Sequence, residues 1–178
     1  MTPKERFDYA VGVVLEHEGG LSNDKYDKGG ITKYGISLRF IQAEGIDIND
    51  DGLIDPRDIK NLSLDDAKDI YKAQWWDKYH YDDINDLKVA TKLFDMSVNT
   101  GAHQAHKLAQ RAVNILIPEK LVVDGILGKK TLNALNGADK YKLMNAMRSE
   151  LGNFYKLLVQ KTPSLGVFMK GWLARAAW

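Results

Sequence analysis

The segment FDYAVGVVLEHEGG (residues 7–20), followed by GGITKYGIS (residues 29–37), decides how the chain begins to fold. Apolar residues recur every three or four positions in the first stretch, which predicts an amphipathic helix. Before it, Thr2, Pro3 and Glu5 supply an N-cap, a proline for the first turn and a capping-box acid, and a glycine pair ends it. The second stretch alternates in the manner of a small β-hairpin.

The rest of the chain shows mainly helical patterns. Further helices are expected at residues 37–44, 63–76, 86–100 and 102–116, in a short segment ending at 137, at 138–161, and from 162 to the C-terminus. The segment 86–100 is almost uniformly apolar, so we expect it at the centre of the core. The sequence therefore predicts a mainly α fold with one small β-hairpin next to the first helix.

Composition excludes several classes of protein. The 178 residues are 44% hydrophobic and 28% charged, as is typical of a globular domain, and the net charge of +1 gives no strong field for nucleic acid. There is no cysteine, so disulfides and thiol catalysis are excluded. No long apolar run predicts a membrane span, and the first residues do not resemble a signal peptide. We expect synthesis in the cytoplasm and release by another route if the target is extracytoplasmic.

Helix geometry separates two glutamates at the end of the first helix. At about 100° per residue, Glu16 lies about 180° from Phe7 and faces solvent, whereas Glu18 lies about 20° from Phe7, on the apolar stripe. Partial burial and the negative end of the helix dipole both disfavour the ionised form of Glu18. A carboxylic acid kept protonated is what a glycosidase needs to protonate a leaving oxygen. The alternative is a glutamate at a frayed helix end.

A second carboxylate and a hydroxyl follow in the hairpin. Asp27 comes nine residues after Glu18, and Thr32 comes five residues after Asp27. Such a carboxylate can hold a water molecule under a sugar ring, and the hydroxyl can orient that water. Aspartate is also a good turn residue, so turn chemistry alone is the competing interpretation.

These residues resemble a known family, the glycoside hydrolase family 108 N-acetylmuramidases of phage endolysins and prophage lysozymes. The resemblance is carried by Glu18-Gly19-Gly20, Asn23-Asp24, Asp27, Gly29-Gly30-Ile31-Thr32, Gly35-Ile36-Ser37, Trp76-Asp77-Lys78-Tyr79, Leu93-Phe94-Asp95 and Val98-Asn99-Thr100-Gly101. Leu21 and Lys25 depart from the family pattern, but neither departure touches the acid. The resemblance implies a lysozyme-like fold, with Glu18 as catalytic acid and with Asp27 and Thr32 in supporting roles.

The second half of the chain is similar to the predicted peptidoglycan-binding region that accompanies this family. That similarity is carried by Gln110, Val113-Asn114, residues 123–128, Thr131, residues 168–173 and Arg175. The resemblance implies a catalytic module at residues 1–101 and a helical peptidoglycan-binding region at residues 102–178. We expect the two to pack into one compact domain because no linker separates them. Peptidoglycan is the expected partner and a monomer is expected.

Four further residues are candidate sugar contacts. Trp76 lies in an aromatic segment that either stacks on sugar rings or packs in the core, and Tyr34 would share the face of Thr32 if the strand continued. Asp95 and Asn99 are spaced four apart on the apolar helix, so they either line a cleft floor or cap a neighbouring turn.

The acidic loop, residues 47–58 (DINDDGLIDPRD), matches the spacing of a calcium loop. Oxygen ligands fall at Asp47, Asn49 and Asp51, with the carbonyl of Leu53 and the carboxylate of Asp58 completing the set. Aspartate in the last position resembles dockerin loops rather than the usual EF-hand. A solvated acidic turn is the alternative. We expect a structural role for this calcium and no cofactor for the chemistry.

The resemblance implies a peptidoglycan hydrolase that cleaves the β-1,4 bond between N-acetylmuramic acid and N-acetylglucosamine. Inversion or retention depends on the separation of the two carboxylates. One alternative is a lytic transglycosylase, which needs the same acid but no water-holding aspartate. Two others are a non-catalytic peptidoglycan-binding scaffold and a calcium-dependent structural module.

Overall fold

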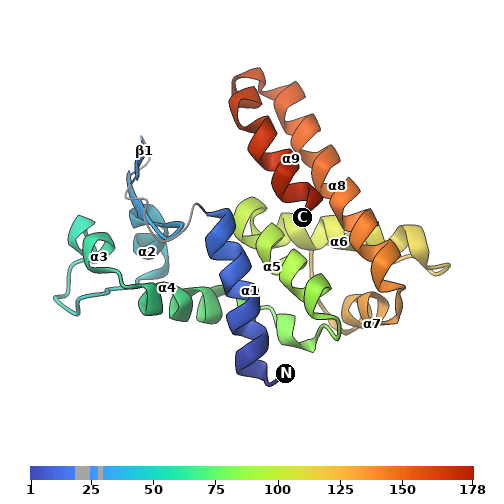
Figure 1. Ribbon diagram of the computed structural model, residues 1–178, viewed down its shortest axis with the longest axis horizontal. Helices are drawn as coiled ribbons and strands as arrows, with labels where there is room; N and C mark the ends of the chain where they lie inside the picture. Colours follow the sequence, from blue (N-terminus) through green and yellow to red (C-terminus); the bar gives the residue numbers. More distant parts are fainter. Residues whose placement is uncertain (19–24, 28–29) are drawn as a thin grey trace. The chain divides into compact units, whose positions relative to one another are not determined.

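The computed structural model describes residues 1–18, 25–27 and 30–178 (Figure 1). They form two compact units, one containing Met1–Ala10 and Trp75–Trp178 and the other Val11–Gln74. The described chain is mainly helical with one small sheet, which confirms the predicted fold class. No helix among these residues is long and apolar enough to cross a membrane.

The unit Val11–Gln74 contains the end of the first helix, a small sheet and three short helices. Its elements are α1 (Pro3–His17, shared with the other unit), β1 (Lys25–Asp27), β2 (Gly30–Lys33), β3 (Ile36–Ser37), α2 (Leu38–Glu44), α3 (Pro56–Asn61) and α4 (Leu64–Tyr71). The strands are antiparallel in the order β1-β2-β3. The predicted hairpin is therefore extended by a third short strand, which leads directly into α2.

Side chains at the helix starts fix where these helices begin. The Ser37 hydroxyl accepts a hydrogen bond from the Phe40 N–H at the start of α2. Ser63 and Asp66 form a reciprocal capping box at the start of α4, as the sequence predicts. These caps satisfy backbone N–H groups that have no partner within the helix.

The other unit is a helical assembly built around α5. Its elements are η2 (a π-helical turn, Lys72–Asp77, at the boundary), η3 (a 3-10 turn, Tyr81–Asp83), α5 (Leu87–Thr100), α6 (Ala102–Leu116), α7 (Lys129–Gly137), α8 (Lys140–Lys161), η4 (a 3-10 turn, Pro163–Phe168) and α9 (Met169–Ala177). The residues from Val89 to Ser97 are all buried, which confirms α5 as the central helix. α6 packs on α5 and α8, and α9 runs back beside α8 (Figure 1).

Candidate active site

Glu18 lies directly after the last residue of α1 and continues its helical turn. Its N–H donates to the carbonyl of Val14 at 2.9 Å. Glu18 is partly buried and Glu16 is exposed, as the helix geometry predicts. A helical hydrogen bond thus fixes the backbone of the candidate acid, while its side chain is only partly buried.

The turn between β2 and β3 packs against the Glu18 side chain. Tyr34 and Gly35 occupy this turn with φ of 52° and 79°, the pair of positive values that a type I′ two-residue hairpin turn requires. A Cβ atom on Gly35 would lie 2.8 Å from Cγ of Glu18 and 2.5 Å from the Tyr71 hydroxyl. Glycine is therefore needed here for both the backbone conformation and the close approach.

Tyr71, near the end of α4, fixes this turn from another element. Its hydroxyl donates to the carbonyl of Tyr34 at 3.0 Å, and its side chain is buried. Glu18, the Tyr34–Gly35 turn and Tyr71 are consequently in one packed arrangement. The sequence alone did not indicate Tyr71, because it lies 37 residues from the turn that it holds.

The hairpin places the other two predicted catalytic positions on neighbouring strands. β1 ends at Asp27, and the register pairs Asp27 with Gly30 and Lys25 with Thr32. Thr32 is partly buried in β2. The side chain of Asp27 and the motif residues 19–24 and 28–29 lie outside the described part of the chain. The roles of Asp27 and Thr32 stay predictions.

Tyr34 lies in the turn and not in a strand. The alternation that would put it on the face of Thr32 therefore does not apply, because strand alternation ends at Lys33. Tyr34 is partly buried, and the Lys33 ammonium lies 5.7 Å from the centre of its ring. Its role as a sugar contact stays a prediction, now without the argument from strand geometry.

Trp76 belongs to the core of its unit, so the prediction of a sugar contact is wrong for this residue. Its side chain is 2% exposed. Its ring makes edge-to-face contacts with Phe7, Tyr81 and Phe94, with centroids 5.6 to 6.2 Å apart. A ring enclosed in this way has no face on which a sugar can stack, and such pairs stabilise the core.

Asp95 does not line a cleft floor either. It is 0% exposed and forms a forked ion pair with Arg175, whose Nη2 and Nε lie 2.8 and 3.1 Å from Oδ1. The carboxylate is committed to joining α5 to α9, so the substrate role predicted for it is wrong. Asn99, one turn later, is exposed, and its Oδ1 accepts from the Tyr155 hydroxyl at 2.6 Å. Asn99 stays a predicted substrate contact.

Next to this ion pair lies a buried amine. Lys92 is 0% exposed, and its ammonium donates to the carbonyls of Arg175 and Ala176 at 2.8 and 3.0 Å. Burial lowers the pKa of Lys92 to about 8. Lys92 thereby satisfies carbonyl groups at the end of α9.

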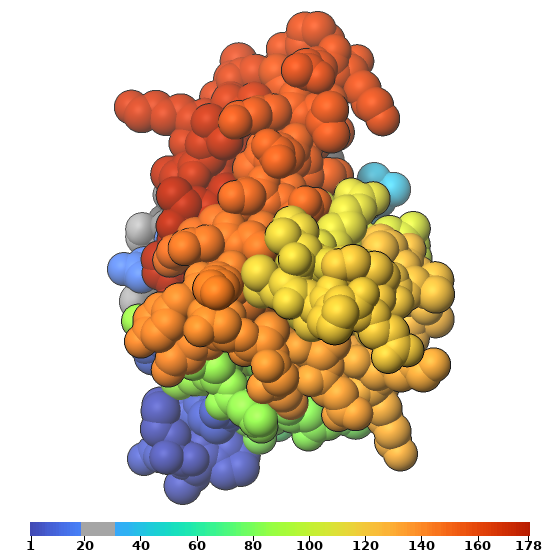
Figure 2. All heavy atoms as spheres, turned by 90° about the vertical axis from the view of Figure 1, so that its right-hand side faces the viewer, coloured from blue at the N-terminus to red at the C-terminus, as the bar shows by residue number. Residues whose placement is uncertain are grey.

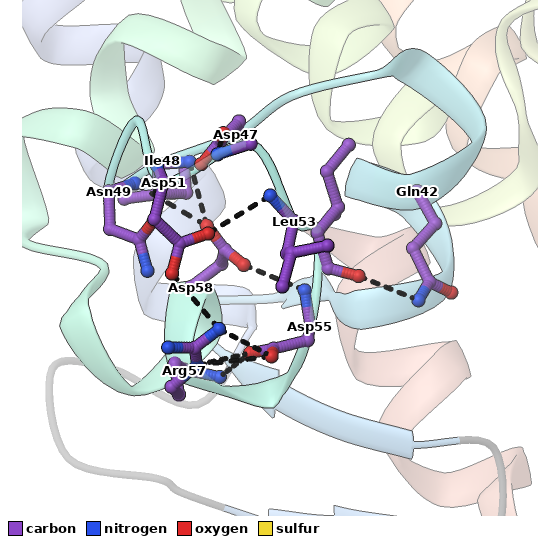
Figure 3. Close-up of polar contacts among 11 residues, drawn as sticks. Gln42, Asp47, Ile48, Asn49, Asp51, Leu53, Asp55, Arg57 and Asp58 are labelled. Carbon is purple, nitrogen blue, oxygen red and sulfur yellow. Dashed lines mark hydrogen bonds and ion pairs between the residues drawn. The ribbon is translucent and has the colours of Figure 1, made fainter.

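The acidic loop is closed by its own side chains (Figure 3). Oδ2 of Asp47 accepts the N–H of Gly52 at 2.8 Å, and the side chains of Asn49 and Asp51 each accept the N–H two residues later, at 3.0 Å. Gly52 has φ of 83°, so it makes the sharp turn that the calcium-loop pattern assigns to it.

Asp58 caps α3 from inside the protein. It is 0% exposed, with Oδ1 accepting the N–H groups of Ile48 and Asn49 and Oδ2 accepting the N–H of Asp55 at 2.7 Å. Burial alone would raise the pKa of Asp58, but these backbone hydrogen bonds outweigh it and hold the pKa below its usual range. Both oxygens are thus engaged by backbone.

The remaining charges of the loop are partly balanced. Nη2 of Arg57 lies 2.9 Å from Asp51 and 3.0 Å from Asp55 (Figure 3). Oδ1 of Asp47 is buried without a hydrogen-bond partner among the described residues. Among all the residues that the structure describes, no three His, Cys, Asp or Glu side chains lie close enough together to hold a metal ion. An ion here would need amide and carbonyl oxygens as ligands too.

Comparison with known proteins adds independent findings. A family model described as Glycosyl hydrolase 108 matches residues 11–101, and one described as Predicted Peptidoglycan domain matches residues 104–177. Twelve chains of solved structures match, among them the structure of Brucella abortus SagA, which is 27% identical, with a TM-score of 0.75 over 98% of this chain and 91% of that one. No curated protein sequence matches significantly.

The two family matches meet between residues 101 and 104, whereas the compact units divide the chain at residues 10 and 74. α5 and α6 pack together across this meeting point, so the division into two modules stays a prediction. The matches support a glycoside hydrolase that acts on peptidoglycan. The first match covers more than half of the sequence, and the chain belongs to the glycosyl hydrolase 108 family.

Proposed function

We propose that the protein is an N-acetylmuramidase with Glu18 as its general acid. The observation that carries this proposal is the partly buried Glu18 side chain, packed against the Tyr34–Gly35 turn inside the segment that the hydrolase family model matches. The substrate bond is the β-1,4 linkage from N-acetylmuramic acid to N-acetylglucosamine. A lytic role of the endolysin type, exerted by a monomer released to the wall, is part of the same proposal.

In this mechanism Glu18 donates its proton to the glycosidic oxygen as the bond to C1 of the muramic acid breaks. Positive charge develops on the sugar ring. Asp27 and Thr32, on paired strands, stabilise this charge or position the water that adds to C1. That water gives its proton to the Asp27 carboxylate if the enzyme inverts, or to the Glu18 carboxylate, which has just lost its own proton, if it retains. The anomer formed first, read by NMR, distinguishes inversion from retention.

The products test the proposal against its alternatives. Purified peptidoglycan is digested with the wild-type protein, and the fragments are weighed by mass spectrometry. The proposal predicts fragments ending in a reducing muramic acid. Ends that are lighter by one water would assign the protein to the lytic transglycosylases. If no fragments form although the protein still binds peptidoglycan, the protein is a non-catalytic peptidoglycan-binding scaffold.

We also propose that the acidic loop binds calcium in a structural role. The support is the buried Oδ1 of Asp47, which a cation would satisfy at a position where an unpaired carboxylate oxygen is costly. The side chains of Asp47, Asn49 and Asp51 and the carbonyl of Leu53 are oxygen donors of the kind that calcium prefers. Asp58 would join them only by giving up backbone hydrogen bonds.

Thermal unfolding with and without millimolar calcium tests this site. We expect calcium to raise the Tm of the wild type, because an ion that binds only the folded state stabilises it. Asp47→Asn should lose this response. Asp50→Asn is the matched control, since Asp50 is exposed, stands outside the ligand pattern and has φ of 55°, which asparagine tolerates. Equal responses of the two variants, or no response of the wild type, would contradict the proposal.

A further inference from the structure

A cavity of about 570 Å³ lies between the end of α6, the segment that follows it and α7. This cavity, called the α6–α7 pocket below, is contained in one compact unit and in the region matched by the peptidoglycan-domain model. Figure 2 shows the yellow segment around residues 115–125 bordering the orange surface of the following helices. The volume falls in the range of small-ligand sites.

Buried polar side chains hold the floor of the pocket in place. Gln110 is 1% exposed, and its amide donates to Oδ1 of Asp124 at 2.8 Å and to the hydroxyl of Thr131 at 3.2 Å. The oxygen of the same amide accepts the N–H of Gly125 at 2.8 Å. These bonds tie the segment after α6 to both helices, so the floor is formed before any ligand arrives.

The segment after α6 that lines the pocket is fixed in the same way. The side chain of Asn114 accepts the N–H of Leu121 at 2.7 Å and donates to its carbonyl at 2.9 Å. The ammonium of Lys120 donates to the carbonyls of Asn114 and Ile117 at the end of α6. A preformed wall lowers the entropic cost of binding.

The pocket lining carries charges of both signs. Glu119 and Asp124 are acidic, and Lys120 and Lys130 are basic. None of the described residues that line it is aromatic, so it offers no ring on which a sugar can stack. The glycan backbone of peptidoglycan is uncharged, whereas its stem peptide carries carboxylates and, where it is not cross-linked, a free amine. The charge pattern therefore suits the peptide part of the polymer.

We propose that the α6–α7 pocket is a subsite for the stem peptide of peptidoglycan. Lys130 faces a carboxylate of the peptide, and Glu119 and Asp124 face its free amine. The inference rests on the proposed function, because it concerns the same polymer. It assigns the second half of the chain to recognition of the peptide and leaves recognition of the sugars to other parts of the protein.

Binding to the full-length Glu18→Gln protein tests the subsite without turnover. The probes are a synthetic stem tetrapeptide with a free amine and a peptide-free disaccharide whose lactyl carboxyl is blocked as an amide, so that it carries no charge, each titrated by calorimetry. We expect the tetrapeptide to bind to the Glu18→Gln protein. The double variant Glu18→Gln/Lys130→Glu should bind the tetrapeptide with roughly tenfold lower affinity. Lys129→Glu is the matched control, because Lys129 is an exposed lysine in the same helical turn but does not line the pocket.

Three results would overturn the inference: no binding of the tetrapeptide, equal weakening by the two lysine variants, or disaccharide binding that Lys130→Glu weakens equally. Hydrolysis of intact peptidoglycan by the wild type is measured alongside. Hydrolysis without peptide binding would reject the subsite and keep the muramidase. Peptide binding without hydrolysis would reject the muramidase and keep the subsite.

Discussion

Glu18 and Asp95 are both carboxylates on the apolar side of a helix, yet their surroundings differ in kind. Glu18 is partly buried beside a glycine turn that leaves no room for a Cβ atom. Asp95 is completely buried and paired with Arg175. One environment leaves the carboxyl group partly exposed to solvent, and the other uses it to join two helices. Position on a helix thus identifies an unusual carboxylate, but its depth and its partner decide what it does.

The largest effect is expected at Asp95. Asp95→Ala removes the carboxylate that neutralises the buried Arg175, and breaking such a pair costs about 3–5 kcal/mol of the free energy of unfolding. Urea unfolding measures the loss, and the double variant Asp95→Ala/Arg175→Met should recover part of it. A stable Asp95→Ala protein that no longer binds peptidoglycan would instead make Asp95 a substrate contact.

The next effect is expected at Gly35. Gly35→Ala pushes a methyl group into the Glu18 side chain and the Tyr71 hydroxyl, and a displaced acid should lower kcat/KM about 100-fold. The control is Gly45→Ala, because Gly45 also has a positive φ, of 67°, while no described atom lies within 4 Å of its added Cβ. Equal losses of activity in the two folded variants would show that backbone strain, and not the contact with Glu18, matters.

The smallest effect concerns the pH dependence of stability around Lys92. The pKa of Lys92 is about 8 in the folded protein against 10.5 in the unfolded chain, so the unfolded state binds more protons between these values. The free energy of unfolding should therefore rise between pH 8 and 10.5, by about 2 kcal/mol. Denaturant unfolding at pH 7.5 and 10 checks this. An equal rise in Lys92→Met would assign the effect to other groups.

The sequence predicts helices well where local signals suffice. The predicted segment 102–116 is α6 (Ala102–Leu116), and the Ser63–Asp66 capping box starts α4. Both depend on periodicity and on side chains within a few residues of the helix end. The separation of Glu16 from Glu18 is equally local, because it needs only the angle per residue.

Long-range contacts explain what the sequence did not predict. Asp95 meets Arg175 across 80 residues, and Tyr71 reaches the Tyr34 carbonyl across 37. Trp76 is enclosed by rings from other segments, which local aromatic density cannot distinguish from a sugar platform. No local sequence pattern encodes contacts between residues so far apart, so only the structure identifies the partners of these side chains.

The central claim is that Glu18 donates the proton, and a comparison of two glutamines tests it most directly. Glu18→Gln and Glu16→Gln make the same chemical change two residues apart, at a partly buried and an exposed position. Release of reducing ends from peptidoglycan should fall at least about 1,000-fold in Glu18→Gln and stay near wild type in Glu16→Gln, with equal Tm values. A Glu18→Gln protein within tenfold of the wild type, or equal losses in both variants, would contradict the account.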